Sequence, residues 1–290
     1  MKLTHILLLS ILITVLLITG MATRSKISNK IRKAIYGNNS LNGKFYTVNG
    51  FQMYCEIYGA GEPLLMIHGN GGDISAFTNQ IPYFSKHYKV IIADSRAQGK
   101  SIEASDSLTY EQMADDFAAL LTTLKIDSAN VLGWSDGGIN GLLLAMRHPE
   151  KVKKLAITGA NLQPDTNAVA PDVINEFMPT YLELKKEATE KTLKNNIDST
   201  KFKLFRLLME QPNILPTDLH RISCPTLVIG GDHDLIRPEH TVKIFQNIPN
   251  AYLWIVPNCG HATLVDYADE FNEKVHHFYK TKYSEGGPSN

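Results

Sequence analysis

The stretch that decides the fold is Gly133-Trp134-Ser135-Asp136-Gly137, near the middle of the chain. An apolar run typical of a buried strand, Ala129–Leu132, precedes it, and an amphipathic pattern typical of a helix, Gly137–Arg147, follows it. The flanking glycines leave space for a sharp strand-to-helix turn that pushes the Ser135 hydroxyl out above the sheet. Ligands of open α/β sheets bind outside the carboxyl ends of the strands, so this position favours a nucleophilic serine. A helix N-cap would explain Ser135 alone but not a glycine on both sides.

Apolar runs alternate with amphipathic stretches on both sides of this turn. Strands are expected at Pro63–Ile67, Tyr88–Ala93, Ala129–Leu132, Val152–Thr158, Pro225–Ile229 and Tyr252–Val256. Helices are expected at Ile74–Lys86, Thr109–Leu124, Gly137–Arg147, Glu239–Asn247 and Tyr267–Tyr279. Two more strands, Lys44–Val48 and Phe51–Ile57, flank Asn49-Gly50, a pair that tolerates positive φ and favours a hairpin. We therefore predict an α/β fold with a mostly parallel, twisted sheet and helices on both faces.

The alternation is interrupted once, between residues 161 and 219. Two charged amphipathic stretches, Tyr181–Ile197 and Lys201–Glu210, follow one another there without an intervening strand. We interpret residues 161–219 as a helical lid inserted into the sheet domain. The domain itself is then expected to comprise residues 44–160 and 220–283.

The first 22 residues are expected to lie outside the folded domain. Ile6–Thr19 is a run of 14 residues without a charge, preceded by Lys2. Gly20-Met21-Ala22 fits a signal-peptidase site, whereas the five positive residues between Arg24 and Lys33 favour a retained membrane anchor. Both readings stay open, and export or membrane attachment is expected through this segment alone. Residues 23–43 are expected to form a polar tether.

The composition narrows the classes of partner. The 29 Lys and Arg residues balance 29 Asp and Glu residues. A chain without net positive charge has no electrostatic attraction for the phosphates of nucleic acid, so nucleic acid is not an expected partner. Cys55, Cys224 and Cys259 lie far apart, so neither a disulfide framework nor a structural zinc site is expected. Asp232-His233-Asp234 is not expected to bind a metal, because successive residues rarely converge on one ion. We predict no metal and no cofactor; the oligomeric state cannot be read from the sequence.

A serine hydroxyl is a weak nucleophile unless a base accepts its proton and an acid orients that base. His261 is the expected base, because it follows a predicted strand in Asn258-Cys259-Gly260-His261, where the glycine lets the ring turn toward the edge of the sheet. Both Asp232 and Asp234 follow another strand. We favour Asp234 as the acid because it lies further into the loop, and expect Asp232 to brace that loop.

The negative oxygen that forms during attack by a serine needs preorganised N–H donors. One expected donor is the backbone N–H of Asp136, at the positive end of a helix dipole. The other is expected from His68-Gly69-Asn70-Gly71-Gly72, most directly from Asn70. His68 itself is interpreted as a residue that braces the loop. A phosphate loop is disfavoured there, since the GxGxxG spacing is missing.

Five motifs in this order make residues 44–282 resemble the α/β-hydrolase superfamily, in which nucleophile, acid and histidine follow one another along the chain. They are His68-Gly69-Asn70-Gly71-Gly72, Asp94-Ser95-Arg96-Ala97-Gln98-Gly99-Lys100-Ser101, Gly133-Trp134-Ser135-Asp136-Gly137-Gly138, Gly231-Asp232-His233-Asp234 and Gly260-His261. Relatives often carry glycine where Ala97 stands. The serine nucleophile argues against haloalkane dehalogenases and epoxide hydrolases, which attack with an aspartate.

Within the superfamily, the sequence of the strand-to-helix turn, Gly133-Trp134-Ser135-Asp136-Gly137-Gly138, looks most like that of the biphenyl hydrolase-like proteins. Some members of that group hydrolyse amino-acid esters. Asp136 puts a carboxylate beside the nucleophile, where it could pair with a substrate ammonium or brace the elbow instead. Trp134 is the other expected substrate contact. The resemblance implies a serine esterase acting on a small molecule. Carbon–carbon bond hydrolysis of a vinylogous diketone and a ligand-binding protein without catalysis are the alternatives.

Overall fold

The computed structural model describes residues 36–103, 107–192 and 196–282. The predicted signal peptide or anchor, residues 1–22, and residues 23–35 of the predicted tether lie outside these ranges. Within them, no helix is both long and apolar enough to cross a membrane. The export and membrane predictions therefore stay predictions.

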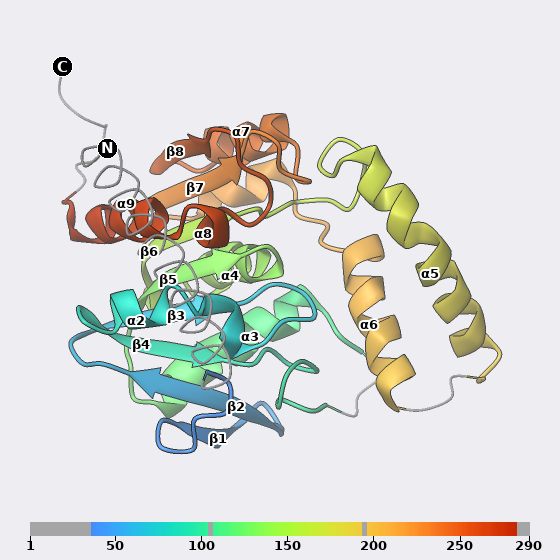
Figure 1. The fold of residues 1–290 in the computed structure, drawn as a ribbon, viewed down its shortest axis with the longest axis horizontal. Helices are drawn as coiled ribbons and strands as arrows, with labels where there is room; N and C mark the ends of the chain where they lie inside the picture. Colours follow the sequence, from blue (N-terminus) through green and yellow to red (C-terminus); the bar gives the residue numbers. More distant parts are fainter. Residues whose placement is uncertain (1–35, 104–106, 193–195, 283–290) are drawn as a thin grey trace, which may run out of the picture.

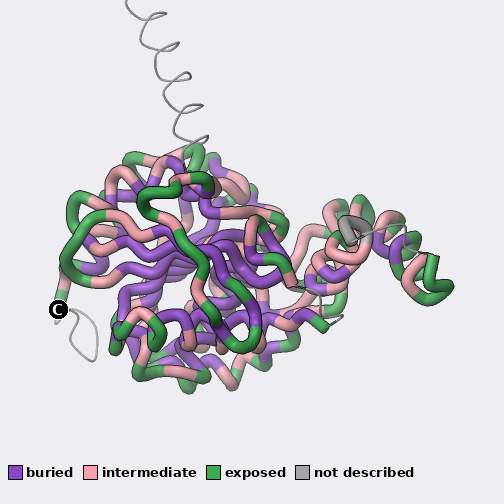
Figure 2. The backbone as a smooth tube through the Cα atoms, turned by 90° about the horizontal axis from the view of Figure 1, so that it is seen from below, coloured by how far each residue is buried: buried purple, intermediate pink, exposed green. Residues whose placement is uncertain are grey.

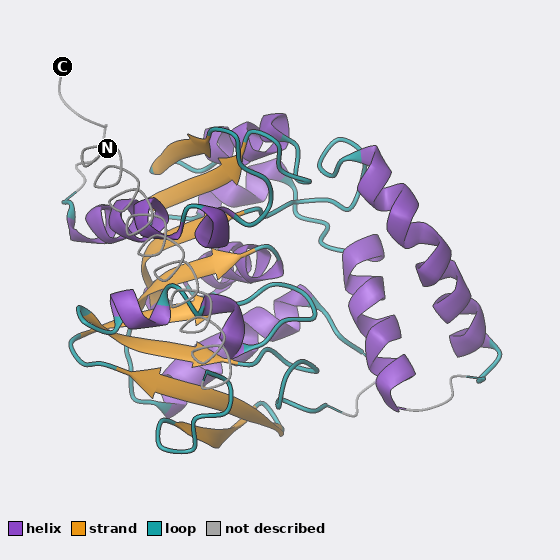
Figure 3. Ribbon diagram, viewed as in Figure 1, coloured by secondary structure: helices purple, strands orange, loops and turns teal. Residues whose placement is uncertain are grey.

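An eight-stranded sheet in the order β1-β2-β4-β3-β5-β6-β7-β8 forms the centre of the molecule (Figures 1 and 3). Its strands are β1 Gly43–Val48, β2 Phe51–Tyr58, β3 Glu62–Ile67, β4 Tyr88–Ala93, β5 Ala129–Trp134, β6 Val152–Thr158, β7 Thr226–Gly231 and β8 Ala251–Val256. β2 is antiparallel to both of its neighbours, and β3 to β8 are parallel. The predicted fold class and every predicted strand are confirmed.

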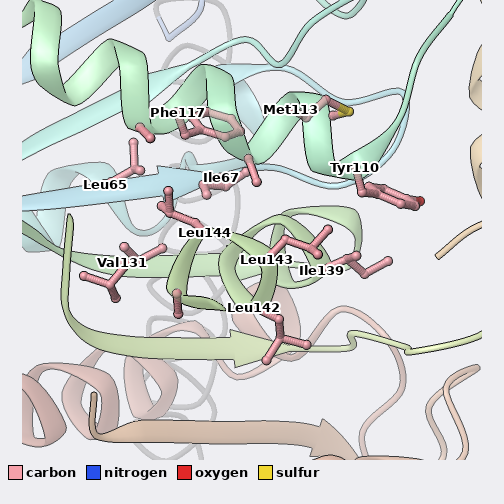
Figure 4. Packing of buried hydrophobic residues seen from close by; sticks show 14 of the residues in the cluster. Leu65, Ile67, Tyr110, Met113, Phe117, Val131, Ile139, Leu142, Leu143 and Leu144 are labelled. Carbon is pink, nitrogen blue, oxygen red and sulfur yellow. The ribbon is translucent and has the colours of Figure 1, made fainter. Parts of the chain in front are cut away.

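Helices cover both faces of the sheet because successive strand residues point to opposite sides. Leu65 and Ile67 of β3 pack in a cluster with α3 (Tyr110–Thr123), α4 (Asp136–Arg147) and α7 (Pro238–Asn247), part of which Figure 4 shows. The alternate residues Leu64 and Met66 pack in a second cluster with α2 (Ile81–Phe84), α8 (Thr263–Asp266) and α9 (Ala268–Lys280). Burial of the two clusters is the main source of stability, at about 25 cal/mol per Å² of apolar surface.

The first hairpin has the predicted turn. Asn49 and Gly50 have φ of 42° and 84°, and Val48 pairs with Phe51 across the turn. The chain before the hairpin is less free than a polar tether. The N–H groups of Gly37 and Asn39 donate to the fully buried Glu56 carboxylate at 3.0 and 2.9 Å, so this part of the predicted tether is fixed on β2.

The helix predicted at 74–86 is divided. The structure has a 3-10 turn, Ile74–Phe77, followed by α2, which contains Pro82 in its first turn. Proline lacks the N–H that a continuous helix would bond to the carbonyl of residue 78, so a new helical turn starts there. The helix predicted at Tyr267–Tyr279 is found as α9, and a separate short helix, α8, precedes it.

Two antiparallel helices, α5 (Pro171–Thr189) and α6 (Asn196–Glu210), form a hairpin that extends from one side of the molecule (Figures 1 and 2). Both helices lie between β6 and β7, within the predicted insertion, and α5 begins ten residues before the predicted start at Tyr181. Pro171 occupies the first helical position, which suits proline. Pro179 lies inside α5 and is exposed, where water can satisfy the carbonyl that proline leaves unpaired.

Candidate active site

Ser135 lies at the sharp turn between β5 and α4, with φ of 57°, a value that costs a non-glycine residue conformational energy. Its N–H donates to the Thr158 carbonyl of the next strand at 2.8 Å. The glycines on both sides are required by close backbone contacts. A Cβ on Gly133 would lie 2.2 Å from the Gly137 oxygen, and one on Gly137 would lie 1.9 Å from the Ile67 oxygen.

Three side chains from separate loops meet at the carboxyl edge of the sheet. Nε2 of His261 lies 2.9 Å from Oγ of Ser135, and Nδ1 of His261 lies 2.7 Å from Oδ1 of Asp234. The Asp234 carboxylate can only accept, so Nδ1 carries the proton and Nε2 is free to accept the serine proton. The Asp234 side chain is fully buried, and the Ile236 N–H also donates to its Oδ1 at 3.0 Å.

The His261 ring has room beside the end of β6 because residue 159, just after that strand, is glycine and has no Cβ. A Cβ there would lie 2.6 Å from Cε1 and 2.8 Å from Nδ1 of His261, and φ of Gly159 is 65°. Gly159 was not among the site residues predicted from the sequence. Its position directly after a parallel strand, at the same edge as the other functional loops, is the signal that could have found it.

Asp232 and Asp234 occupy different environments two residues apart. Oδ1 of Asp232 accepts from the Cys259 N–H at 3.0 Å and lies 2.8 Å from Nδ1 of His233, away from His261. These hydrogen bonds, that of His233 above all, lower the pKa of Asp232. Asp232 thus connects the loops after β7 and β8, while Asp234 contacts the imidazole.

The loop that follows β3 lies against the nucleophile. A Cβ on Gly69 would be 3.1 Å from Cβ of Ser135, which places Asn70 beside the serine. Asp136 is the first residue of α4, where a helix leaves its N–H groups without an intrahelical partner. The two predicted oxyanion donors therefore flank Ser135, and their role as donors stays a proposal.

His68 holds the same loop in shape. Its Nδ1 donates to the Gly69 carbonyl at 2.8 Å, and its Nε2 accepts from the Ser95 N–H at 2.9 Å. Both ring nitrogens are occupied by backbone groups. Burial also lowers the pKa of His68, so a neutral bracing ring fits this position better than a second base.

The Asp136 carboxylate is buried and paired inside the protein. Nδ2 of Asn70 donates to its Oδ2 at 2.8 Å, and the Tyr110 hydroxyl, at the start of α3, also bonds to it. Burial raises the pKa of Asp136 to about 6. Figure 4 shows the Tyr110 hydroxyl pointing away from the aliphatic cluster. This geometry fits a brace between two loops, and Tyr110 is a member that sequence analysis missed because it lies 26 residues away from Asp136.

Trp134 contacts His261 through both its indole N–H and its ring. Its Nε1–H donates to the His261 carbonyl at 2.9 Å, and its ring centroid lies 6.1 Å from that of the imidazole. The indole therefore holds the histidine loop as well as lining a cavity beside it.

Two cavities meet at Ser135. The inner pocket is lined by Tyr110 and Asp136 and by apolar side chains of the hairpin, among them Val173, Ile174 and Met209. The rim pocket is lined by the 69–72 loop, Trp134 and His261. Ser135, Phe177, Leu208 and Leu235 line both. Within the described ranges, no cluster of three or more His, Cys, Asp or Glu side chains is arranged to hold a metal ion.

Comparison with known proteins identifies the family. The model of the alpha/beta hydrolase fold family matches residues 62–214, more than half of the chain. The chain belongs to the α/β-hydrolase family. It is 27% identical over 262 residues to the human serine hydrolase BPHL, covering 84% of this chain and 88% of that protein. It is 28% identical over 247 residues to the 2-hydroxymuconate semialdehyde hydrolase of a Pseudomonas strain, covering 76% and 87%.

A solved structure also matches this hydrolase along most of its length. The enol-lactonase of Burkholderia xenovorans superposes with a TM-score of 0.66 at 23% identity, covering 82% of this chain and all of that one. At this identity the likeness shows the fold alone. Together with the family match it confirms the predicted superfamily, and the named relatives support a hydrolase.

Proposed function

We propose that this α/β-hydrolase is a serine esterase that cleaves carboxylic esters of uncharged, mainly apolar acids through an acyl-enzyme on Ser135. The observation that carries the proposal is the relay Ser135–His261–Asp234, with contacts of 2.9 and 2.7 Å. Its order and distances are those of a nucleophile, a general base and an orienting acid.

The reaction follows from the positions of these atoms. His261 Nε2 takes the proton as Oγ of Ser135 attacks the ester carbon, and the N–H groups of Asn70 and Asp136 stabilise the negative oxygen. His261 then gives the proton to the departing alcohol, which leaves the acyl group on Ser135. Water, deprotonated by the same nitrogen, releases the acid. The buried Asp234 keeps the imidazole in the required tautomer and stabilises its charged form.

The two cavities take different parts of the ester. The departing alcohol must lie next to His261, which protonates it, and His261 lines the rim pocket but not the inner one. The alcohol part therefore belongs in the rim pocket, and the acyl part in the inner pocket. Because the inner pocket is largely apolar, it suits an uncharged acyl group.

The alternative, hydrolysis of a carbon–carbon bond, is less well supported. The Pseudomonas relative is named for 2-hydroxymuconate semialdehyde, which carries a carboxylate. Among the described residues that line the two pockets, none is Lys or Arg, and the inner pocket contains the Asp136 carboxyl. A second buried negative charge without a cation would be costly there. Recognition of an ammonium by Asp136 is also disfavoured, since Asn70 and Tyr110 already bond to its carboxylate.

Labelling with a fluorophosphonate probe, together with hydrolysis of p-nitrophenyl esters, tests the proposal. We expect covalent labelling and turnover by the wild type, and neither by Ser135→Ala. The panel adds an anionic dienoate substrate and an aminoacyl ester. A wild type that is never labelled would favour the ligand-binding alternative, and faster turnover of the dienoate than of any ester would favour carbon–carbon hydrolysis.

A further inference from the structure

Three apolar side chains stand between the two cavities. Phe177 of α5, Leu208 of α6 and Leu235 of the loop after β7 line both the inner and the rim pocket, and the nucleophile Ser135 is the only other described residue that does so. They come from three separate parts of the chain and are each partly exposed. Because both cavities share these lining side chains, the cavities adjoin one another at them and at Ser135.

Phe177 is held in this position by its neighbours. Its ring packs edge-on against Phe205 of α6, with centroids 5.9 Å apart and an interplanar angle of 89°. Such aromatic pairs contribute about 0.5–1.5 kcal/mol beyond their burial. One helical turn earlier on the same face of α5, Val173 and Ile174 line the inner pocket alone. The ring of Phe177 therefore marks where the inner pocket ends.

Leu235 is fixed as firmly from the other side. The Ala170 N–H donates to the Leu235 carbonyl at 2.8 Å, and Val169 pairs with Ile236 across an isolated bridge. The start of the lid is thus bonded to the loop that carries Asp234. Opening the lid at this end would disturb the acid, so the boundary between the pockets is expected to stay closed there during turnover.

We propose that Phe177, with Leu208 and Leu235, forms a partition that confines the acyl group to the inner pocket and that Phe177 sets the largest acyl group accepted. This inference rests on the proposed ester hydrolysis and names the determinant of its acyl specificity. With the phenyl ring present, a small or unbranched acyl group fits beside Ser135, whereas a branched or aromatic one meets the ring. Replacing the ring by a methyl group joins the two cavities on the acyl side of the nucleophile.

Two ester series separate acyl from alcohol effects. In the first, the p-nitrophenyl alcohol is constant and the acyl group grows from acetyl to butyryl, pivaloyl and phenylacetyl. In the second, the acetyl group is constant and the alcohol grows. For Phe177→Ala we expect the ratio of kcat/KM for pivaloyl to acetyl esters to rise about tenfold, with a smaller change in the alcohol series, because Phe177 also lines the rim pocket; a tenfold ratio corresponds to about 1.4 kcal/mol. Leu208→Ala should shift the acyl ratio in the same direction if Phe177→Ala does not fold.

The matched control is Leu182→Ala, which removes an apolar side chain from the outer face of the same helix, where Leu182 is 54% exposed. It should leave both series unchanged. An active enzyme whose acyl ratio is unchanged in Phe177→Ala and Leu208→Ala, or whose alcohol series shifts instead, overturns the partition alone. A wild type that hydrolyses no ester and takes no fluorophosphonate overturns the proposed function and the partition with it.

Discussion

Several charged side chains at the carboxyl edge of the sheet are buried and paired, whereas most of those on the described part of the α5–α6 hairpin, Lys203 excepted, lie at least partly at the surface. Arg96 and Asp116, near the edge, are 3% and 0% exposed and form a 2.6 Å ion pair. In the hairpin, Lys185 and Glu210 are 52% and 41% exposed in a 2.9 Å pair. A fixed edge suits a relay that must hold its distances, and a less constrained hairpin suits a surface that admits substrates. On the two proposals above, the chemistry and the specificity of this hydrolase reside in differently built regions.

The largest effect should come from the acid at the edge. Asp234→Asn removes the charge that orients and stabilises the His261 imidazole, and we expect kcat for a p-nitrophenyl ester to fall by about 10³–10⁴-fold. The matched control is Asp232→Asn, since an amide oxygen can still accept from the Cys259 N–H; its kcat should change by less than about threefold. Steady-state kinetics of both purified variants is the measurement. Equal losses would show that Asp232 takes part in the relay.

The next effect tests burial directly, with the same substitution type in both regions. Arg96→Met leaves the Asp116 carboxylate buried without its cation and should lower the free energy of unfolding by about 3–5 kcal/mol. Arg96 also lies 3.8 Å over the Phe51 ring, a contact that methionine keeps only in part. Lys185→Met in the hairpin should change the free energy of unfolding far less, because exposed ion pairs contribute little to stability. Urea titration of both variants measures the difference, and similar losses would contradict the contrast between the regions.

The third effect depends on pH. Burial raises the pKa of Asp136 from 3.8 to about 6, so the native state binds this proton more tightly than the unfolded chain does. The group therefore stabilises the fold below pH 3.8, and this contribution is lost as the pH rises through 6. The loss amounts to about 3 kcal/mol, from about 1.4 kcal/mol per pKa unit.

Asp136→Asn should remove this part of the pH dependence, measured as the free energy of unfolding between pH 4.5 and 7.5. Burial also raises the pKa of Asp94 to about 6. Asp94 therefore contributes equally to the pH dependence of the wild type and of Asp136→Asn. Asp172→Asn is the control in the hairpin, because Asp172 is exposed in the first turn of α5. It should follow the wild-type curve. An Asp136→Asn curve parallel to that of the wild type would show that the carboxyl titrates alike in both states.

The same contrast explains how much could be predicted from the sequence. Ser135, Asp234 and His261 each follow a strand within a few residues, and parallel strands bring such positions to one edge. Local spacing was therefore enough to predict that they meet. Tyr110 was missed because its role depends on a contact with Asp136, which is remote in the sequence and which no local pattern reveals. The position of Gly159 after a parallel strand marks the edge of the sheet, but its contact with His261 is seen only in the structure.

The hairpin was predicted to exist, but its first helix was misplaced. The predicted helix began at Tyr181, whereas α5 begins at Pro171 and continues through Pro179, which is exposed. Phe177 was not predicted to line a pocket, for a related reason. An apolar residue of an amphipathic helix looks the same in sequence whether it packs against a core or lines a cavity. The acyl pocket thus needed the structure.

The smallest effect compares two left-handed residues, Ala97 at the edge and Lys191 at the end of α5, with φ of 63° and 58°. Glycine removes about 1 kcal/mol of strain at each position and loses about 0.5–1 kcal/mol through the freer unfolded chain. Lys191 is exposed and follows a helix end where Thr192 N–H donates to the Glu187 carbonyl at 2.8 Å, an arrangement that favours glycine. Lys191→Gly should therefore stabilise the fold by up to about 0.5 kcal/mol.

Ala97→Gly should have the opposite sign, although relatives often carry glycine there. The Ala97 methyl group is 7% exposed and belongs to the cluster that contains Phe51, so its removal forfeits about 0.8 kcal/mol of burial. The net expectation is a loss of about 0.3–0.8 kcal/mol of unfolding free energy, measured by urea titration of both variants. If Ala97→Gly were instead as stabilising as Lys191→Gly, the methyl group would contribute no packing. The turn at the edge would then be as loosely held as the end of the hairpin, and the contrast between the two regions would not extend to Ala97.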